Sequence, residues 1–119
     1  MRLQKILNSL QKLHPKEIDL SLDRIKKLCK KLGNPQNNLK YISIVGTNGK
    51  YSTIQATRAI LKDANINCNV YTSPHIQKIN ERYEYNNQEI SDEELSGLLL
   101  KVKEINNNDA ITYFEILTA

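Results

Sequence analysis

Apolar residues recur every three or four positions in four stretches of the chain, the spacing that places them on one face of an α-helix. The stretches are Leu3–Leu13, Leu22–Leu32, Ile54–Ala64 and Leu95–Ile105. His14-Pro15 ends the first stretch, because a residue before proline disfavours the helical conformation. Ser21 is the expected N-cap of the second and Gly33 its C-cap, while Ser91 and Glu94 form a capping-box pattern before the fourth. The pattern predicts four amphipathic helices.

Short β-branched and aromatic runs between these helices predict strands. Tyr41–Val45 and Asn69–Thr72 flank the third helix, and Arg82–Tyr85 with Glu89-Ile90 are separated by the turn residues Asn86-Asn87-Gln88. The order strand, glycine-containing loop, helix and strand indicates a βαβ unit with parallel neighbouring strands. We therefore expect an α/β fold with parallel strands and flanking helices, and either a small hairpin or an extended excursion around Asn86-Asn87-Gln88.

The composition narrows the class of protein. The chain has 119 residues, of which 39% are hydrophobic and 25% charged, as in globular domains. No apolar run approaches the ~20 residues of a membrane span, and the N-terminus lacks the apolar stretch of a signal peptide. The two cysteines, Cys29 and Cys68, are too few for a disulfide framework. These features predict a cytoplasmic location and no membrane partner.

Charge is distributed unevenly. Residues 1–40 carry ten Lys/Arg against three Asp/Glu, a net +7, whereas residues 41–119 carry seven against ten, a net −3. A basic N-terminal third could bind nucleic acid or another polyanion. No aromatic residue lies among these lysines, however, so lysines covering the solvated faces of helices are the favoured interpretation. We expect no nucleic-acid partner.

Candidate chemistry is concentrated in the loop Gly46-Thr47-Asn48-Gly49-Lys50-Tyr51-Ser52-Thr53, between a predicted strand and a predicted helix. Glycines let backbone amides approach an anion, and a helix N-terminus adds partial positive charge. Lysine at the helix start can reach phosphate oxygens, and a nearby hydroxyl can bind Mg²⁺. The spacing is shorter than the common G-x-x-x-x-G-K-[ST] form, so a tight strand–helix turn with a surface lysine is the alternative.

Further motifs accompany this loop in order. They are Leu22-Asp23-Arg24-Ile25, Leu32-Gly33-Asn34-Pro35-Gln36, Tyr71-Thr72-Ser73-Pro74-His75, Asn80-Glu81-Arg82, Ile90-Ser91-Asp92-Glu93-Glu94 and Thr112-x-Phe114-Glu115-x-Leu117-Thr118-Ala119. With the loop, they resemble the N-terminal part of folylpolyglutamate synthases, often also dihydrofolate synthases, in the Mur ligase superfamily. The combination of GTNGK, TSPH and FExLTA is typical of this folate branch.

The resemblance implies the first part of a Mur-ligase-type P-loop ATP-binding domain over residues 41–119, preceded by a basic helical segment over residues 1–40. It implies an ATP-dependent carbon–nitrogen ligase that adds L-glutamate to folate or dihydropteroate through an acyl phosphate, with Mg²⁺ as cofactor. Its partners would be these small molecules, and the full-length enzyme would be a monomer.

The resemblance also assigns roles to individual residues. Lys50 would be catalytic. ATP would be bound by Gly46, Thr47, Asn48, Gly49, Lys50, Ser52 and Thr53, metal by Ser52, Ser73 and Glu115, and the pterin substrate by Ser73, Pro74, His75 and Arg82. By their residue types alone, Ser73-Pro74 could be a strand-ending turn and Glu115 a solvated helix residue.

Two departures from the family bear on activity. Tyr51 stands where the folate branch has glycine, and its ring would occupy phosphate or metal space if it pointed into the site. Family members are also several-fold longer and carry a C-terminal domain that helps to bind glutamate. We therefore expect a truncated N-terminal fragment that is not a competent ligase alone. The alternatives are a non-catalytic nucleotide- or folate-binding remnant, another Mur-type ligase and a polyanion-binding module.

Overall fold

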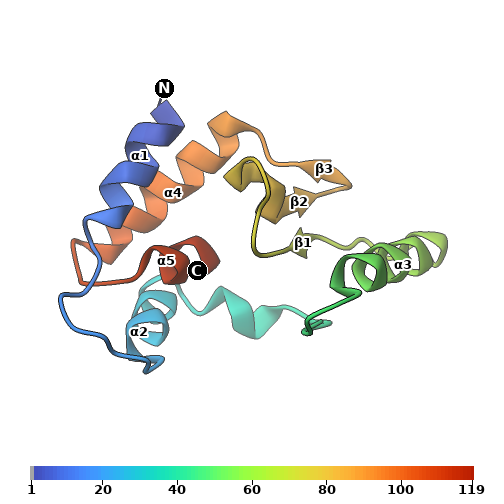
Figure 1. Cartoon of the computed structure of the whole chain (residues 1–119), viewed down its shortest axis with the longest axis horizontal. Coiled ribbons are helices and arrows are strands. Elements are labelled where there is room, and N and C mark those ends of the chain that lie inside the picture. The colour runs from blue at the N-terminus through green and yellow to red at the C-terminus, as the bar shows by residue number, and fades with distance from the viewer. Residues whose placement is uncertain (1) are drawn as a thin grey trace. The chain divides into compact units, whose positions relative to one another are not determined.

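All four predicted helical stretches are helices in the computed structural model, which describes residues 2–119. They are α1 (Arg2–Gln11), α2 (Asp23–Lys31), α3 (Lys50–Asp63) and α4 (Asp92–Asn106), and a short helix α5 (Tyr113–Thr118) follows (Figure 1). The N-cap of α2 is Leu22 rather than the expected Ser21, whose hydroxyl instead accepts a hydrogen bond from the Asp23 amide at 3.4 Å. Gly33 lies just beyond the C-cap Leu32, with a φ of 87°, as in a Schellman ending.

The chain divides into two units that are described separately below. The first contains the described residues up to Leu39 together with Asp92–Ala119, and the second is Lys40–Ser91. The C-terminal helices α4 and α5 therefore belong to the same unit as the N-terminal segment. The domain division predicted from the sequence, at residue 40, concerns the ATP-binding domain and differs from this division into compact units.

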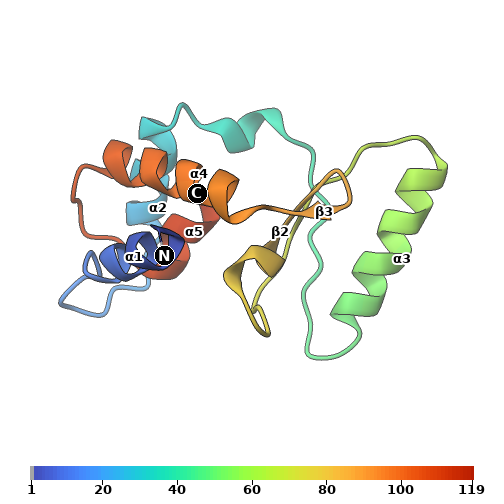
Figure 2. The ribbon, with the colours of Figure 1, turned by 90° about the horizontal axis from the view of Figure 1, so that it is seen from above.

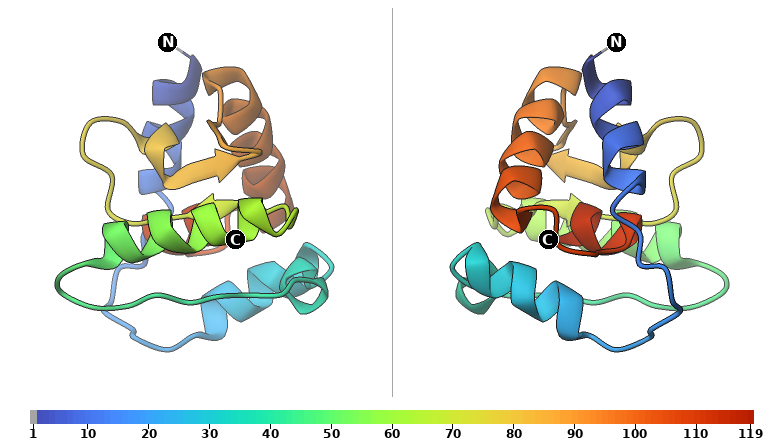
Figure 3. Two further views of the ribbon diagram at one scale, coloured as in Figure 1. Left: turned by 90° about the vertical axis from the view of Figure 1, so that its right-hand side faces the viewer. Right: turned by 90° about the vertical axis from the view of Figure 1, so that its left-hand side faces the viewer.

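The first unit is a small helical assembly with its own hydrophobic core. Helices α1 and α4 lie side by side in it (Figure 3). The core residues expose at most 9% of their surface and come from every α-helix of the unit: Leu3, Ile6, Leu7, Leu10, Leu28, Leu95, Leu99, Ile111, Ile116 and Leu117. The periodic apolar stripes that predicted the helices thus supply the contacts that hold them together.

Polar contacts join the same helices. Lys103 Nζ donates to Ser9 Oγ at 2.8 Å between α4 and α1, and the Ile111 amide donates to the Leu13 carbonyl at 2.9 Å. Lys27 and Lys31 of α2 both pair with Asp109, at 3.0 and 2.7 Å. Part of the positive charge of residues 1–40 is therefore neutralised within the unit.

The second unit contains α3 and a small antiparallel sheet of β1 (Val70–Tyr71), β2 (Tyr83–Tyr85) and β3 (Gln88–Glu89), in the order β1-β2-β3. The predicted hairpin is confirmed as β2–β3, with Tyr85 opposite Gln88 (Figure 2). Asn86 and Asn87 form its two-residue turn with φ values of 49° and 63°, the left-handed pair that favours asparagine. Arg58 of α3 pairs with Glu84 of β2, and this ion pair ties the helix to the sheet.

The asparagine-rich composition has a structural use. Every non-glycine residue with a positive φ within residues 2–119 is an asparagine: Asn34, Asn65, Asn86, Asn87, Asn107 and Asn108. Asparagine tolerates the left-handed region better than other side chains, so these positions end helices and turn the chain at low cost.

The predicted strand at Tyr41–Val45 and the predicted parallel pairing are not found within residues 2–119. Residues 41–45 form an extended segment without strand assignment, and β1 pairs with β2 in antiparallel orientation. A strand requires hydrogen bonds to a neighbour, and none of the described strands pairs with this segment. Ile42 and Val45 are consequently 65% and 88% exposed, and α3 has no buried residue.

Within residues 2–119, none of the helices combines the length and the apolar character that crossing a membrane requires.

Candidate functional site

Two glycines set the path of the phosphate loop. The N-cap of α3 is Gly49, with a φ of 76°, and Gly46 has a φ of 155°. Both values lie in regions that side-chain-bearing residues rarely adopt, so glycine is favoured at both positions. The loop thereby leads the chain from the extended segment 41–45 directly into the first turn of α3.

This path leaves a row of backbone donors without acceptors. The amides of residues 46–52 donate to no acceptor within the described part of the chain, and the first backbone bond into the helix joins the Thr53 amide to the Gly49 carbonyl at 3.0 Å. Unsatisfied amides at a helix N-terminus, together with the helix dipole, favour an anion such as a phosphate group. Residues 46–52 therefore present unpaired backbone donors at a helix N-terminus, where an anion is favoured.

The side chains of the loop differ in availability. Lys50 is the first residue of α3 and forms no ion pair within residues 2–119, and the Ser52 hydroxyl has no hydrogen-bond partner there. Thr53 Oγ1, by contrast, donates to the Gly49 carbonyl at 2.8 Å. Tyr51 exposes 73% of its surface, so its ring lies largely in solvent rather than inside the protein. Of the Ser52 and Thr53 hydroxyls, that of Ser52 is therefore the one without a hydrogen-bond partner in the described chain.

The predicted substrate residues lie in one loop between β1 and β2. The loop contains a cis Ser73-Pro74 bond, and Glu81 organises its second half. The Glu81 carboxylate accepts hydrogen bonds from the amides of Ile76, Gln77 and Lys78 at 3.0, 2.8 and 2.8 Å. These backbone donors lower the pKa of Glu81 below its ordinary value.

The same loop brings His75 and Arg82 into contact. Arg82 Nε donates to His75 Nδ1 at 2.8 Å, and both residues are partly buried. The Thr72 amide donates to the Arg82 carbonyl at 2.9 Å, which closes the base of the loop beside the Tyr71–Tyr83 pair of β1 and β2. The structure thus places two of the four predicted substrate residues against each other, while Ser73 and Pro74 are exposed.

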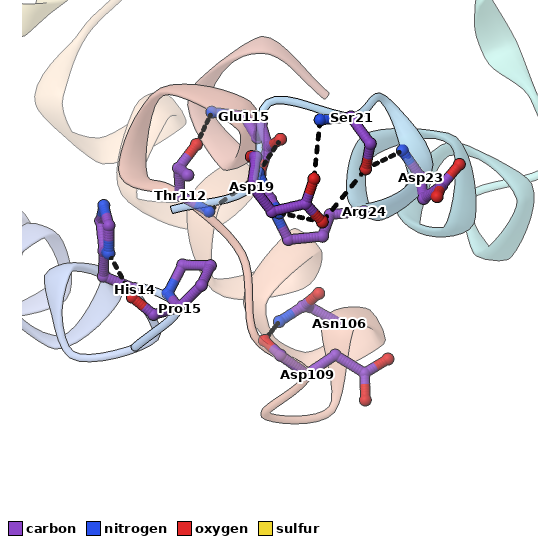
Figure 4. Close-up of polar contacts among 10 residues, drawn as sticks. All are labelled: His14, Pro15, Asp19, Ser21, Asp23, Arg24, Asn106, Asp109, Thr112 and Glu115. Carbon is purple, nitrogen blue, oxygen red and sulfur yellow. Dashed lines mark hydrogen bonds and ion pairs between the residues drawn. The ribbon is translucent and has the colours of Figure 1, made fainter. Parts of the chain in front are cut away.

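Glu115 belongs to the first unit and is held by its neighbours there (Figure 4). Its Oε2 accepts from Arg24 Nε at 2.9 Å and from the Thr112 amide at 2.9 Å, and its Oε1 accepts from Arg24 Nη2 at 3.1 Å. The Thr112 hydroxyl accepts from the Glu115 amide, which completes a capping box at the start of α5. Burial raises the pKa of Glu115, but the bonds from Arg24 and Thr112 lower it by more.

The donor chemistry suits a hard divalent cation. Hydroxyl and carboxylate oxygens are the ligands that Mg²⁺ binds, usually together with substrate phosphates and water. The hydroxyls of Ser52 and Ser73 have no partner within residues 2–119, and Glu115 retains about one of the four acceptor positions of a carboxylate. The described residues contain no group of three or more His, Cys, Asp or Glu placed to hold a metal. Each of the Ser52, Ser73 and Glu115 side chains offers an oxygen ligand within its own unit.

Sequence reasoning missed two organising residues, Glu81 and Arg24. Glu81 lies inside the motif Asn80-Glu81-Arg82, but an isolated glutamate carries no signal that it will bind the three amides that lie three to five residues earlier. Arg24 lies in the motif Leu22–Ile25, and its partner Glu115 is 91 residues away. Only the tertiary structure pairs them.

Comparison with known proteins gives a consistent set of relatives, although no family model matches the chain. The chain is 38% identical to the dihydrofolate synthase/folylpolyglutamate synthase of Haemophilus influenzae over 112 residues, which are 94% of this chain and 25% of that protein. It is 38% identical to the Bacillus subtilis protein of the same name over 104 residues, or 82% of this chain and 24% of the relative. The chain thus spans about a quarter of the length of these relatives.

A solved structure has a similar fold. A bifunctional folylpolyglutamate synthase/dihydrofolate synthase, solved with Mn, AMPPNP and L-glutamate bound, superposes with a TM-score of 0.85. It is 33% identical to this chain, and the match covers 98% of this chain and 28% of that protein. The structural neighbour therefore binds a nucleotide analogue, a divalent metal and glutamate.

Proposed function

Because the chain is a homologue of the dihydrofolate synthase/folylpolyglutamate synthase family along nearly its whole length, we propose that it supplies the nucleotide and pterin loops of an ATP-dependent ligase. The enzyme would join L-glutamate to folate or dihydropteroate in the cytoplasm. Residues 41–119 would form the first part of its ATP-binding domain, after the basic helical segment 1–40. The remaining parts of the nucleotide site and the glutamate site would come from polypeptide corresponding to the other three quarters of the relatives.

The main support is the row of unsatisfied amides at the start of α3, with Lys50 beside it. Gly46, Thr47, Asn48 and Gly49 would surround the β- and γ-phosphates of ATP. Lys50 would neutralise charge that spreads over the phosphate oxygens in the transition state, which is the main catalytic task in phosphoryl transfer. Thr53 would stabilise the loop through its bond to Gly49 rather than bind ATP through its hydroxyl.

The reaction would proceed in two displacements. A carboxylate oxygen of the folate attacks the γ-phosphorus, the bond to the β-phosphate oxygen breaks, and ADP leaves. The amine of glutamate then attacks the acyl carbon, phosphate leaves, and the amine loses a proton. Mg²⁺ would neutralise phosphate charge, with Ser52, Ser73 and Glu115 as protein ligands. Ser73, Pro74, His75 and Arg82 would line the pterin site.

A non-catalytic nucleotide- or folate-binding protein is the second candidate. It is favoured by Tyr51, which places a large ring beside Lys50 and Ser52 where the family has glycine. Tyr51 is 73% exposed, so its ring does not fill the interior of the loop and is compatible with nucleotide binding. The two candidates predict the same binding but differ in turnover.

The test combines binding with turnover. We expect the purified chain to bind MgATP or its non-hydrolysable analogue in calorimetric titration, and Lys50→Met to weaken this binding. The matched control is Lys62→Met, since Lys62 lies in the last turn of the same helix. Equal affinities for the wild type and Lys50→Met would refute the nucleotide site. ATP- and glutamate-dependent turnover by the 119-residue chain would refute our expectation that it needs further polypeptide for catalysis.

A further inference from the structure

The contact between Arg82 and His75 determines where the imidazole proton lies. Arg82 Nε donates to His75 Nδ1 at 2.8 Å. An arginine side chain has only N–H donors and no acceptor, so the Nδ1 atom must offer a lone pair. A neutral imidazole carries a single proton, which in this arrangement must be on Nε2.

The surrounding loop holds both residues in place. Glu81, next to Arg82, fixes the backbone just after His75 through the amides of Ile76, Gln77 and Lys78. Arg82 itself directly precedes β2 and is anchored through its carbonyl by the Thr72 amide. The two partners of the Arg82–His75 bond therefore approach each other from anchored parts of one loop, within a single unit.

We propose that Arg82 is a positioning residue that orients His75 with Nδ1 as the acceptor and Nε2–H as the donor toward a ligand. With Nδ1 occupied by Arg82 and Nε2 protonated, His75 has no free lone pair for a general base or for a metal. A histidine that binds metal instead donates its second N–H to a carboxylate or a carbonyl. His75 is thus assigned to an acceptor oxygen of a ligand, such as a pteridine carbonyl or a carboxylate; the identity of this ligand rests on the proposed function.

The second histidine of the chain provides a reference for the assignment of the His75 tautomer. It has two histidines, and the other, His14, places its Nδ1 atom 2.8 Å from the Pro15 carbonyl (Figure 4). A carbonyl only accepts hydrogen bonds, so His14 carries a proton on Nδ1 in this contact. The two rings are therefore expected to differ in one measurable property, the protonation of Nδ1.

The test is nuclear magnetic resonance of the ¹⁵N-labelled chain above neutral pH, where imidazole nitrogens with and without a proton have well-separated shifts. His14→Gln assigns the two rings. We expect His75 to have unprotonated Nδ1 and protonated Nε2, and Arg82→Met to convert it to a mixture of tautomers. Arg82→Gln retains an N–H donor, so it should retain more of the wild-type pattern. The spectrum of the wild-type chain tests the tautomer even if a variant fails to fold.

A wild-type His75 with its proton on Nδ1 would overturn the proposal, as would a folded Arg82→Met variant with an unchanged pattern. Loss of the Nε2 proton on addition of Mg²⁺ would show a metal ligand and would also overturn it. Pteroate, used as the probe, should shift the Nε2–H signal, and Arg82→Met should weaken its binding about tenfold, the effect of one hydrogen bond. If His75 has the expected tautomer but pteroate does not shift its Nε2–H signal, the assignment of His75 to the substrate is contradicted. The positioning role of Arg82 is then still supported.

Discussion

Gly49→Ala and Gly97→Ala are the same chemical change in two helices, and the structure predicts opposite effects on stability. Gly49 is the N-cap of α3, with a φ of 76°, whereas Gly97 lies inside α4. A Cβ added at either position would meet no atom within 4 Å, so steric contact does not separate the two sites. The two sites differ in backbone conformation, because Gly49 is left-handed and Gly97 is helical.

The magnitudes follow from that difference. A left-handed backbone costs an L-residue about 1–2 kcal/mol. Replacing glycine by alanine also reduces the conformational freedom of the unfolded chain, which stabilises the folded protein by about 0.4–1 kcal/mol. We therefore expect Gly49→Ala to lower the free energy of unfolding by about 1 kcal/mol. Gly97→Ala should raise it by about 0.8–1 kcal/mol, because alanine is the better helix former.

Urea unfolding measures both changes. Helix content is followed by circular dichroism, and tyrosine fluorescence reports mainly on the second unit, which contains five of the six tyrosines. Gly49→Ala should also weaken MgATP binding, since it disturbs the amides of the phosphate loop. If Gly49→Ala proved neutral or stabilising while Gly97→Ala stabilised as expected, Gly49 would not be left-handed. The loop geometry on which the nucleotide site rests would then be wrong.

Four further predictions test other parts of the molecule. Leu95→Ala should cost about 2–4 kcal/mol in urea unfolding and Leu98→Ala about 1 kcal/mol or less, since they are 2% and 54% exposed on the same helix; equal losses would contradict the assigned core. Val45→Lys should leave the melting temperature nearly unchanged, because Val45 is 88% exposed; a drop of several degrees would indicate a buried strand. The pKa of Glu81 is lowered from 4.5 by its amide donors, so its contribution to stability is complete above that value and is lost as the pH falls through the lower, folded-state pKa. Glu81→Gln should remove this pH dependence of stability. Identical acid-unfolding curves for the wild type and Glu81→Gln would refute the prediction. Tyr51→Gly should leave the affinity for ATP nearly unchanged, because the Tyr51 ring is 73% exposed and does not fill the loop; a clear rise in affinity would show that the ring obstructs the site.

Local features of the fold were predictable from the sequence because they depend on nearby residues. The periodic stripes located α1–α4, and the Asn86-Asn87 pair located the hairpin turn. The glycines at positions 46 and 49 predict a phosphate loop, and both have positive φ values, a conformation for which glycine is favoured. The family resemblance likewise came from short motifs whose order along the chain could be recognised directly.

Partners distant in sequence were decided by the tertiary structure alone. Tyr41–Val45 has the composition of a strand, but strand hydrogen bonds come from another segment, and the described chain supplies none. Glu115 is a predicted metal ligand, and only the tertiary structure shows that Arg24 of α2, 91 residues away in sequence, donates two hydrogen bonds to its carboxylate. His75 was identified from its motif, but only its contact with Arg82 shows which ring nitrogen carries the proton. The sequence thus determined the helices, the turns and the chemical groups available. Which groups meet depends on how the folded backbone brings separate segments within hydrogen-bonding distance.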